Sequence, residues 1–322
     1  SALNVLRGVR RVQVSLGYDP PALASLNLSL KGLMHEVIAV HGPEVLEIKR
    51  TLPIPFPAQC DLLRVMRSTG LRLGSRVTNR VSCLFWCSLV ALTTTLASSG
   101  MRKAEVTSTT KKLSRTNLLR SNLTWIINHK FESDPTEAQL RSMTPGSSWA
   151  VIKPCPSKAD PFGMVWGTKP IYLSYCPSKE INAATSLMEL ELMFPLHDDE
   201  RHNRALFCDN DKMPLTGHAL DRLLQSMLTA AGHTTLYSWH SFRAALACQL
   251  LEAGASTADI MALCRWQSEE SLAGYAQHSA QAYTRLLDDA YARDFTQVRY
   301  SQTPVAQEYE MIRNMNGIHI SA

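Results

Sequence analysis

The sequence lacks most of the short motifs that identify nucleotide-binding or metal-binding enzymes. Its 322 residues contain no P-loop, no GxGxxG, no internal repeat and no low-complexity tract. Its eight cysteines include no Cys-x-x-Cys pair; Cys83 and Cys87 could face one another on a helix, but no histidine cluster lies nearby. A structural zinc site needs four close ligands, so we expect no metal and no cofactor. The cysteines are typical of small buried side chains in a reducing compartment.

No signal peptide is present, and because Ser1 is not a natural start we expect a truncated N-terminus. Residues 81–101 carry no charge and are nearly long enough to span a bilayer. Seven serines and threonines interrupt this run, which favours a buried core helix. We therefore expect no contact with a membrane, and an intracellular location.

Positive charge is concentrated in the first part of the chain. The net charge is +5 and the calculated pI is about 8.8. Residues 1–150 hold 19 Lys and Arg against 9 Asp and Glu, whereas residues 151–322 hold 14 against 19. This distribution fits a surface that follows a polyanion. A solvated basic face would give the same count.

The chain divides by composition into four parts. Residues 1–50 resemble the end of a helical domain, and residues 51–58 contain three alternating prolines, which favours an extended linker. We expect the main domain over residues 59–295 and a tail over 296–322. The predicted fold is mainly α with a small antiparallel β-sheet (α+β), its strands at 117–128, 149–153 and 164–173. A turn-rich segment between the last two strands would present Lys158 near a hairpin tip.

The most informative stretch runs from His240 to Tyr275. His240 and Arg243 are three residues apart, so on a helix they face the same way. Arginine is a permanent fork of donors shaped for phosphate, and histidine changes protonation near neutrality. Trp266 adds an indole donor, and Tyr275 a phenol that could attack phosphorus. Three short helices would bring these residues together. The first has an apolar stripe of Phe242, Leu246 and Leu250 and ends at the C-cap Gly254. The second is capped by Ser256 or Thr257 and buries Ile260 and Leu263, and the third follows Ser268.

A second box precedes this stretch at residues 99–105. Arg102 and Glu105 lie three residues apart at a helix start after Gly100. Arg102 could clamp a phosphate while Glu105 fixes the local geometry; an ordinary surface ion pair has the same spacing. Lys158 could donate a proton, with Lys153 and Lys169 as rivals, and Tyr283 is the rival of Tyr275. Cations that could contact phosphate follow residue 59: Arg64, Arg67, Arg72, Arg76, Arg80, Lys103, Lys111, Lys112, Arg115 and Arg120.

In order and spacing, these boxes resemble the signature of the tyrosine recombinases, the phage-type integrases. The resemblance covers roughly residues 55–295, and Lys158 lies where that family keeps its lysine. Trp266 in place of a second histidine, together with the turn at residues 158–163, is most similar to eukaryotic mobile-element recombinases of the crypton or DIRS kind. Ala244-Ala245 and Cys264 depart from the common pattern of that family.

The resemblance implies the tyrosine-recombinase catalytic fold and a mechanism without metal or ATP. Arg102 and Arg243 would clamp the phosphate, His240 and Trp266 would add hydrogen bonds, Tyr275 would form a 3′-phosphotyrosyl link, and Lys158 would protonate the leaving 5′-oxygen. The implied partners are double-stranded DNA and three further copies of the chain, a homotetramer on two DNA sites, in the nucleus if the host is eukaryotic.

Three other interpretations remain open from the sequence. The first is a non-catalytic DNA-binding protein derived from a mobile element. The second is a type IB topoisomerase, which shares the cleavage chemistry but not the exchange of partners. The third is a soluble helical protein that has these residues by chance.

Overall fold

The computed structural model describes residues 52–76, 80–113, 117–156, 160, 162–164, 169–234 and 236–266, with isolated positions between 16 and 40 and at 288. The chain divides into two units, Ser1–Thr51 and Leu52–Ala322. In the first unit, the described positions are a turn at Leu16–Gly17 and exposed helical residues between positions 29 and 40.

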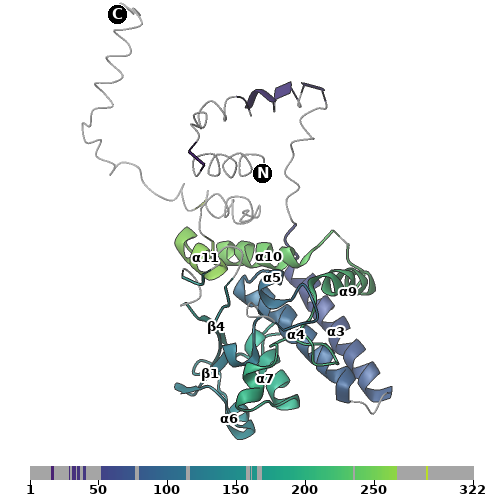
Figure 1. The fold of residues 1–322 in the computed structure, drawn as a ribbon, viewed down its shortest axis with the longest axis vertical. Helices are drawn as coiled ribbons and strands as arrows, with labels where there is room; N and C mark the ends of the chain where they lie inside the picture. The colour runs from purple at the N-terminus through teal and green to yellow at the C-terminus, as the bar shows by residue number, and fades with distance from the viewer. Residues whose placement is uncertain are drawn as a thin grey trace, which may run out of the picture. The chain divides into compact units, whose positions relative to one another are not determined.

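The described part of the second unit is mainly helical, with one small antiparallel sheet (Figure 1). This confirms the predicted fold class. The elements in chain order are α3 (Phe56–Arg76), α4 (Arg80–Ser99), α5 (Lys103–Val106), η2 (Arg120–Asn122), β1 (Leu123–Ile127), β2 (Lys130–Glu132), α6 (Glu137–Arg141), β3 (Trp149–Ile152), β4 (Ile171–Ser174), α7 (Ala183–Met193), α8 (Asp199–His202), α9 (Gly217–Ala230), α10 (Trp239–Glu252) and α11 (Thr257–Cys264).

Helix α3 begins inside the segment that the sequence predicts to be a linker. Pro57 lies in its first turn, where a missing backbone N–H leaves no helical bond unmade. Ile54 is fully buried, and its backbone N–H donates to the Ser241 carbonyl at 3.3 Å. Residues 52–58 therefore belong to the packed second unit, and its boundary lies at Thr51–Leu52.

Helix α4 is the central element of the core and packs against α3, α7 and α10. It is the uncharged run that the sequence predicts to be a buried helix, and that prediction is confirmed. Its buried hydroxyls bond back to the helix itself: Thr93 Oγ1 donates to the Leu89 carbonyl at 2.8 Å, and Ser99 Oγ to the Thr95 carbonyl at 2.6 Å. None of the helices in the described ranges is long and apolar enough to cross a membrane.

The sheet has the order β2-β1-β3-β4, and all its neighbouring strands are antiparallel. The antiparallel pairing of β3 with β4 was expected, but β1 begins only at Leu123, after the 3-10 turn η2. Strand β2 was missed. Its two-residue connection, Asn128-His129, has φ of 49° and 68°, which is the left-handed backbone of a tight hairpin turn.

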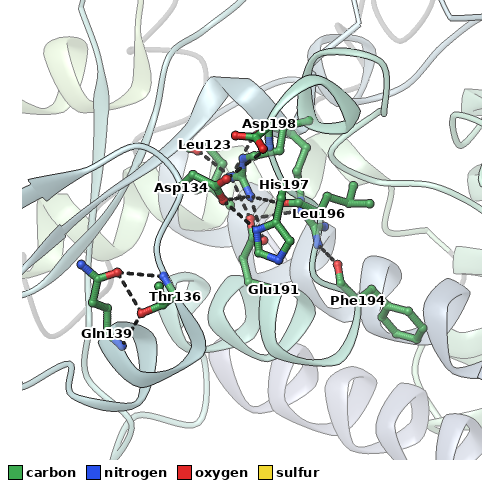
Figure 2. Close-up of polar contacts among 11 residues, drawn as sticks. Leu123, Asp134, Thr136, Gln139, Glu191, Phe194, Leu196, His197 and Asp198 are labelled. Carbon is green, nitrogen blue, oxygen red and sulfur yellow. Dashed lines mark hydrogen bonds and ion pairs between the residues drawn. The ribbon is translucent and has the colours of Figure 1, made fainter.

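A buried ionic cluster joins the sheet to α7 and α8 (Figure 2). This Glu191 cluster consists of Glu191, Arg120, Arg201 and Asp134. The Glu191 carboxylate contacts Arg120 Nε at 3.1 Å and Arg201 Nη1 at 3.0 Å, and Arg201 Nη1 lies 3.7 Å from Asp134 Oδ1. Two guanidinium groups therefore face two carboxylates.

Backbone carbonyls complete the Glu191 cluster. Arg120 Nη2 donates to the Phe194 carbonyl at 2.7 Å, and Arg201 Nη2 donates to the Leu123 carbonyl at 3.1 Å. Both arginines are almost completely buried. The polar segment 197–204 is thus more than a solvated loop, because it contains α8 and supplies Arg201. His197 and His202 in the same segment are exposed, as expected.

Candidate active site

The turn between α4 and α5 forms one side of the candidate site. Gly100 has φ of +59°, and a Cβ there would lie 2.9 Å from the backbone Cα of Cys264. Only glycine allows both this left-handed backbone and this close approach. The turn therefore brings the start of α5, with Arg102 at its N-cap, against the end of α11.

Helix α10 supplies His240 and Arg243. Ser238 caps the helix: its side chain accepts from the His240 N–H at 3.2 Å, while Ser241 Oγ accepts from the Ser238 N–H at 2.9 Å. The helix continues to Glu252, and Gly254 follows it with φ of +82°, as the sequence predicts. His240 is half-buried, whereas Arg243 is 1% exposed.

The end of α11 folds back over α10. Ser256 caps the start of α11 and Ile260 is buried, as expected, but Leu263 is exposed. After the helix, Arg265 adopts a left-handed backbone (φ 57°, ψ 49°), and the Trp266 N–H donates to the Met261 carbonyl at 2.9 Å. This reversal places the Trp266 ring under Arg243.

Arg243 is the residue on which the three segments meet. Its Nη1 donates to the Gly100 carbonyl and its Nη2 donates to the Arg265 carbonyl at 3.3 Å. Its guanidinium carbon lies 5.2 Å from the centroid of the Trp266 ring, within the range of a cation–π contact. The arginine thereby ties the α4–α5 turn to the end of α11.

Glu105 links two further arginines. Its Oε2 contacts Arg265 Nη1 at 2.6 Å, and its Oε1 contacts Arg102 Nη1 at 3.2 Å. The Glu105 and Arg265 side chains are each 6% exposed, whereas the Arg102 side chain is 38% exposed. The pair of Arg102 and Glu105 is therefore part of a larger buried network rather than an isolated surface ion pair.

Among the residues that the structure describes, the site holds more positive than negative charge. Arg102 and Arg265 contact the Glu105 carboxylate, and Arg243 lies nearby. Burial, with a smaller effect from the neighbouring Arg102, lowers the pKa of Arg243 to about 10. Burial, with Arg243 and Arg102 nearby, also lowers the pKa of His240, so its imidazole is neutral at pH 7. An unbalanced cation cluster with a neutral imidazole at its exposed side is suited to an anion.

The structure thus brings together five of the seven predicted catalytic residues: Arg102, Glu105, His240, Arg243 and Trp266. Lys158 and Tyr275 lie outside the described residues, as do Tyr283 and Arg115. The rival lysines, Lys153 after β3 and Lys169 before β4, are exposed. In the parts of the chain that the structure describes, no group of three or more His, Cys, Asp or Glu side chains could hold a metal.

Three of the predicted DNA contacts have acidic partners within the protein. Arg64 contacts Asp61 and Glu180, each at 2.7 Å; Lys103 contacts Asp221 at 2.6 Å and Lys111 contacts Asp209 at 2.9 Å. Arg67 is half-buried on α3 and Lys112 is exposed. Arg72, Arg76 and Arg80 are helical, and their side chains lie outside the described residues. Exposed ion pairs are weak, so phosphate could replace these carboxylates.

Sequence reasoning missed Arg265. The only local signal is a permanent cation directly before Trp266, and its partner Glu105 is 160 residues away in the chain. Arg120 was counted among the cations that could contact DNA, but it is buried in the Glu191 cluster.

Comparison with known proteins gives a family match over part of the chain and a similar solved structure. The Phage integrase family model matches residues 172–282, a span that contains His240, Arg243, Trp266 and Tyr275. No curated protein sequence matches the chain. Among solved structures, the crystal structure of XerA recombinase aligns with a TM-score of 0.45 and 14% sequence identity, over 90% of this chain and 74% of the recombinase.

Proposed function

We propose that this protein is a tyrosine recombinase, which cuts and rejoins DNA through a covalent 3′-phosphotyrosyl link. One observation carries the proposal. Arg102 and Glu105 lie outside the span that matches the phage integrase family, yet the fold places them beside Arg243 and Trp266, which lie within it. Residues selected by two separate sequence boxes therefore meet in one cationic site.

The charge of the site suits a phosphodiester. The scissile phosphate carries one negative charge, and attack by Tyr275 as the phenolate would add a second as the pentacovalent species forms. Arg102 and Arg243 would stabilise this added charge more strongly than the ground state, which is the condition for lowering the barrier. His240 and Trp266 would donate hydrogen bonds beside them.

Each cleavage step balances without another reactant. The Tyr275 phenol would release its proton to water as its oxygen forms a bond to phosphorus, the bond from phosphorus to the 5′-oxygen would break, and Lys158 would give its proton to that oxygen and recover one from water. The reverse reaction with the 5′-hydroxyl of a second strand restores the phosphodiester and frees Tyr275. The energy of the bond stays in the phosphotyrosyl link.

Arg102 and His240 would meet the phosphate first. They are the partly exposed members of the site, whereas Arg243 lies beneath them. Double-stranded DNA would follow the cations of α3 to α5, and Arg64, Lys103 and Lys111 would exchange carboxylate for phosphate. Binding should therefore weaken steeply with salt.

Exchange between two duplexes requires four cuts, and one tyrosine cuts one strand, so we propose four copies on two DNA sites. The turn at residues 158–163 and the tryptophan in place of a second histidine support a mobile-element enzyme, which would act in the nucleus of a eukaryotic host. We propose that residues 1–50 form part of a DNA-gripping helical domain and that residues 296–322 form a tail.

The test is a trap for the covalent link. The protein is incubated with a pool of nicked duplexes that contain a randomised region, so that the cut strand diffuses away and the link persists. We expect a protein–DNA adduct that survives detergent in the wild type and is absent in Tyr275→Phe, with equal retention of DNA in a native gel. A protein that retains DNA but never forms an adduct is a DNA-binding protein only. Relaxation of supercoiled plasmid without joining of two different duplexes would indicate a topoisomerase.

A further inference from the structure

Arg265 occupies a position that the proposed chemistry does not explain. Its side chain is 6% exposed, so it does not meet solvent, and its Nη1 lies 2.6 Å from Glu105 Oε2. Its carbonyl oxygen accepts a hydrogen bond from Arg243 Nη2 at 3.3 Å. One residue therefore contacts both the partner of Arg102 and Arg243 itself.

The two contacts of Glu105 divide its carboxylate between two arginines. Oε2 faces the buried Arg265 and Oε1 faces the half-exposed Arg102. With both oxygens held, the carboxylate cannot turn. Without the Arg265 side chain, Oε2 of the buried Glu105 carboxylate would lose its partner, and Arg102 would be the remaining partner of the carboxylate. A buried unpaired oxygen is costly, so Glu105 would draw the Arg102 guanidinium inwards and neutralise it.

The backbone of Arg265 makes a second contact, which is independent of its side chain. Its left-handed conformation turns the chain so that its carbonyl points to Arg243 and the Trp266 ring lies beside the same guanidinium. Because this contact uses a backbone oxygen, side-chain substitutions leave it in place. The side-chain contact to Glu105 can therefore be tested by itself.

We propose that Arg265 is a positioning residue: its side chain holds Glu105 from the buried side, which keeps Arg102 at the exposed side and free to bind phosphate. The inference rests on the proposed function for the role of Arg102. It assigns to Arg265 no contact with the DNA.

The experiment is a double-mutant cycle between Arg265→Met and Arg102→Met. The first readout is the rate of adduct formation with the nicked duplex pool. The second is the affinity for the same pool at fixed salt, measured in the Tyr275→Phe background. Arg265→Met should slow adduct formation about a hundredfold, the scale expected when a reacting group shifts by about 1 Å. In Arg102→Met protein it should add little, because the residue it positions is gone.

Arg201→Met provides the matched control. Arg201 is a buried arginine that holds Glu191 through the same kind of ion pair, and among the described residues its hydrogen bonds and ion pairs include no residue of the candidate site. It should lower thermal stability but combine additively with Arg102→Met in both readouts. Arg265→Lys, which restores a charge opposite Glu105 without the fork, should recover part of the lost rate.

Additive losses for Arg265→Met and Arg102→Met in both readouts would overturn the inference, because a structural role does not depend on Arg102. If Arg265→Met does not fold, Arg265→Gln, whose amide can still donate to Glu105, replaces it in the same cycle. If the wild type forms no adduct with any duplex, the proposed function fails, and the affinity cycle alone decides the role of Arg265.

Discussion

The protein contains two buried clusters of arginine and carboxylate, and they differ in charge balance. In the Glu191 cluster, two arginines face two carboxylates, and backbone carbonyls take further guanidinium donors. In the candidate site, the described residues place Arg102 and Arg265 in contact with the Glu105 carboxylate, with Arg243 nearby. Among the described residues, the charges of the first cluster therefore balance, whereas those of the second sum to a positive charge.

The arginine side chains of the two clusters also differ in their exposed fraction. Arg120 and Arg201 side chains are 2% and 4% exposed, but the Arg102 side chain of the candidate site is 38% exposed. The Glu191 cluster, whose most exposed side chain is Asp134 at 29%, joins the sheet to α7 and α8, whereas the candidate site presents an arginine to solvent. The same residue types thus serve the fold in one region and the chemistry in the other.

The largest effect on stability should come from Glu191→Gln. It leaves Arg120 and Arg201 with one carboxylate fewer, and breaking a buried ion pair from one side costs about 3–5 kcal/mol. Chemical denaturation should show this loss, while the adduct rate per folded molecule stays unchanged. Glu189→Gln, on the exposed side of the same helix, is the control and should change neither. A slower adduct rate with full stability would assign Glu191 to the chemistry.

Arg243→Met should show the opposite pattern. Loss of one preorganised charge at a developing anion slows catalysis by about 10²–10³-fold, measured as the adduct rate. The free energy of unfolding should fall far less than in Glu191→Gln. The variant loses two hydrogen bonds, but it also removes a buried guanidinium whose pKa burial has already lowered to about 10, and these two effects offset one another. Arg141→Met, an exposed arginine of α6, is the control. An unfolded Arg243→Met protein would mean that Arg243 belongs to the fold.

A smaller effect is expected from Gly100→Ala, which tests the contact that assembles the site. The left-handed backbone costs a residue with a Cβ about 1–3 kcal/mol. Gly232→Ala at the end of α9 bears the same backbone strain, with φ of +74°, but its Cβ would meet nothing within 4 Å. Both variants should lose stability in denaturation. Only Gly100→Ala should also slow adduct formation, because its Cβ separates Cys264 from the α4–α5 turn; equal adduct rates would show that this approach does not matter.

The smallest effect concerns pH. The pKa of His240 is lowered in the folded protein, so the unfolded chain takes up the proton first as the pH falls below the ordinary value of 6.5. Unfolding free energy should therefore decrease from about pH 7 to about pH 5, and His240→Gln should remove this part of the slope. The exposed His202→Gln is the control. An identical slope in wild type and His240→Gln would show that His240 is not desolvated.

Local sequence signals predicted the elements of the candidate site well. The spacing of Arg102 and Glu105, the pair His240 and Arg243, and Gly254 after α10 each depend on neighbours within one or two helical turns. The antiparallel pairing of β3 and β4 and the burial of α4 were also predictable, because alternation and an uncharged run are visible in the sequence.

The rest depends on residues that meet only after folding. Arg265 finds Glu105 from 160 positions away, and Arg120 meets Glu191 from a distant helix. The sequence therefore predicted Arg120 to be one more surface cation that could contact phosphate. The start of α3 was missed because alternating prolines favour extended chain, although a helix accepts Pro57 in its first turn and the buried Ile54 holds the segment in place.

The central claim is that the unbalanced cluster serves cleavage by Tyr275, and the site of covalent attachment tests it most directly. The adduct trapped on nicked DNA is digested with nuclease and protease, and the modified peptide is sequenced by mass spectrometry. The account predicts a single phosphonucleotide on Tyr275, which forms far more slowly in Arg243→Met under the same conditions. A phosphonucleotide on Tyr283, or on any other residue, would contradict it.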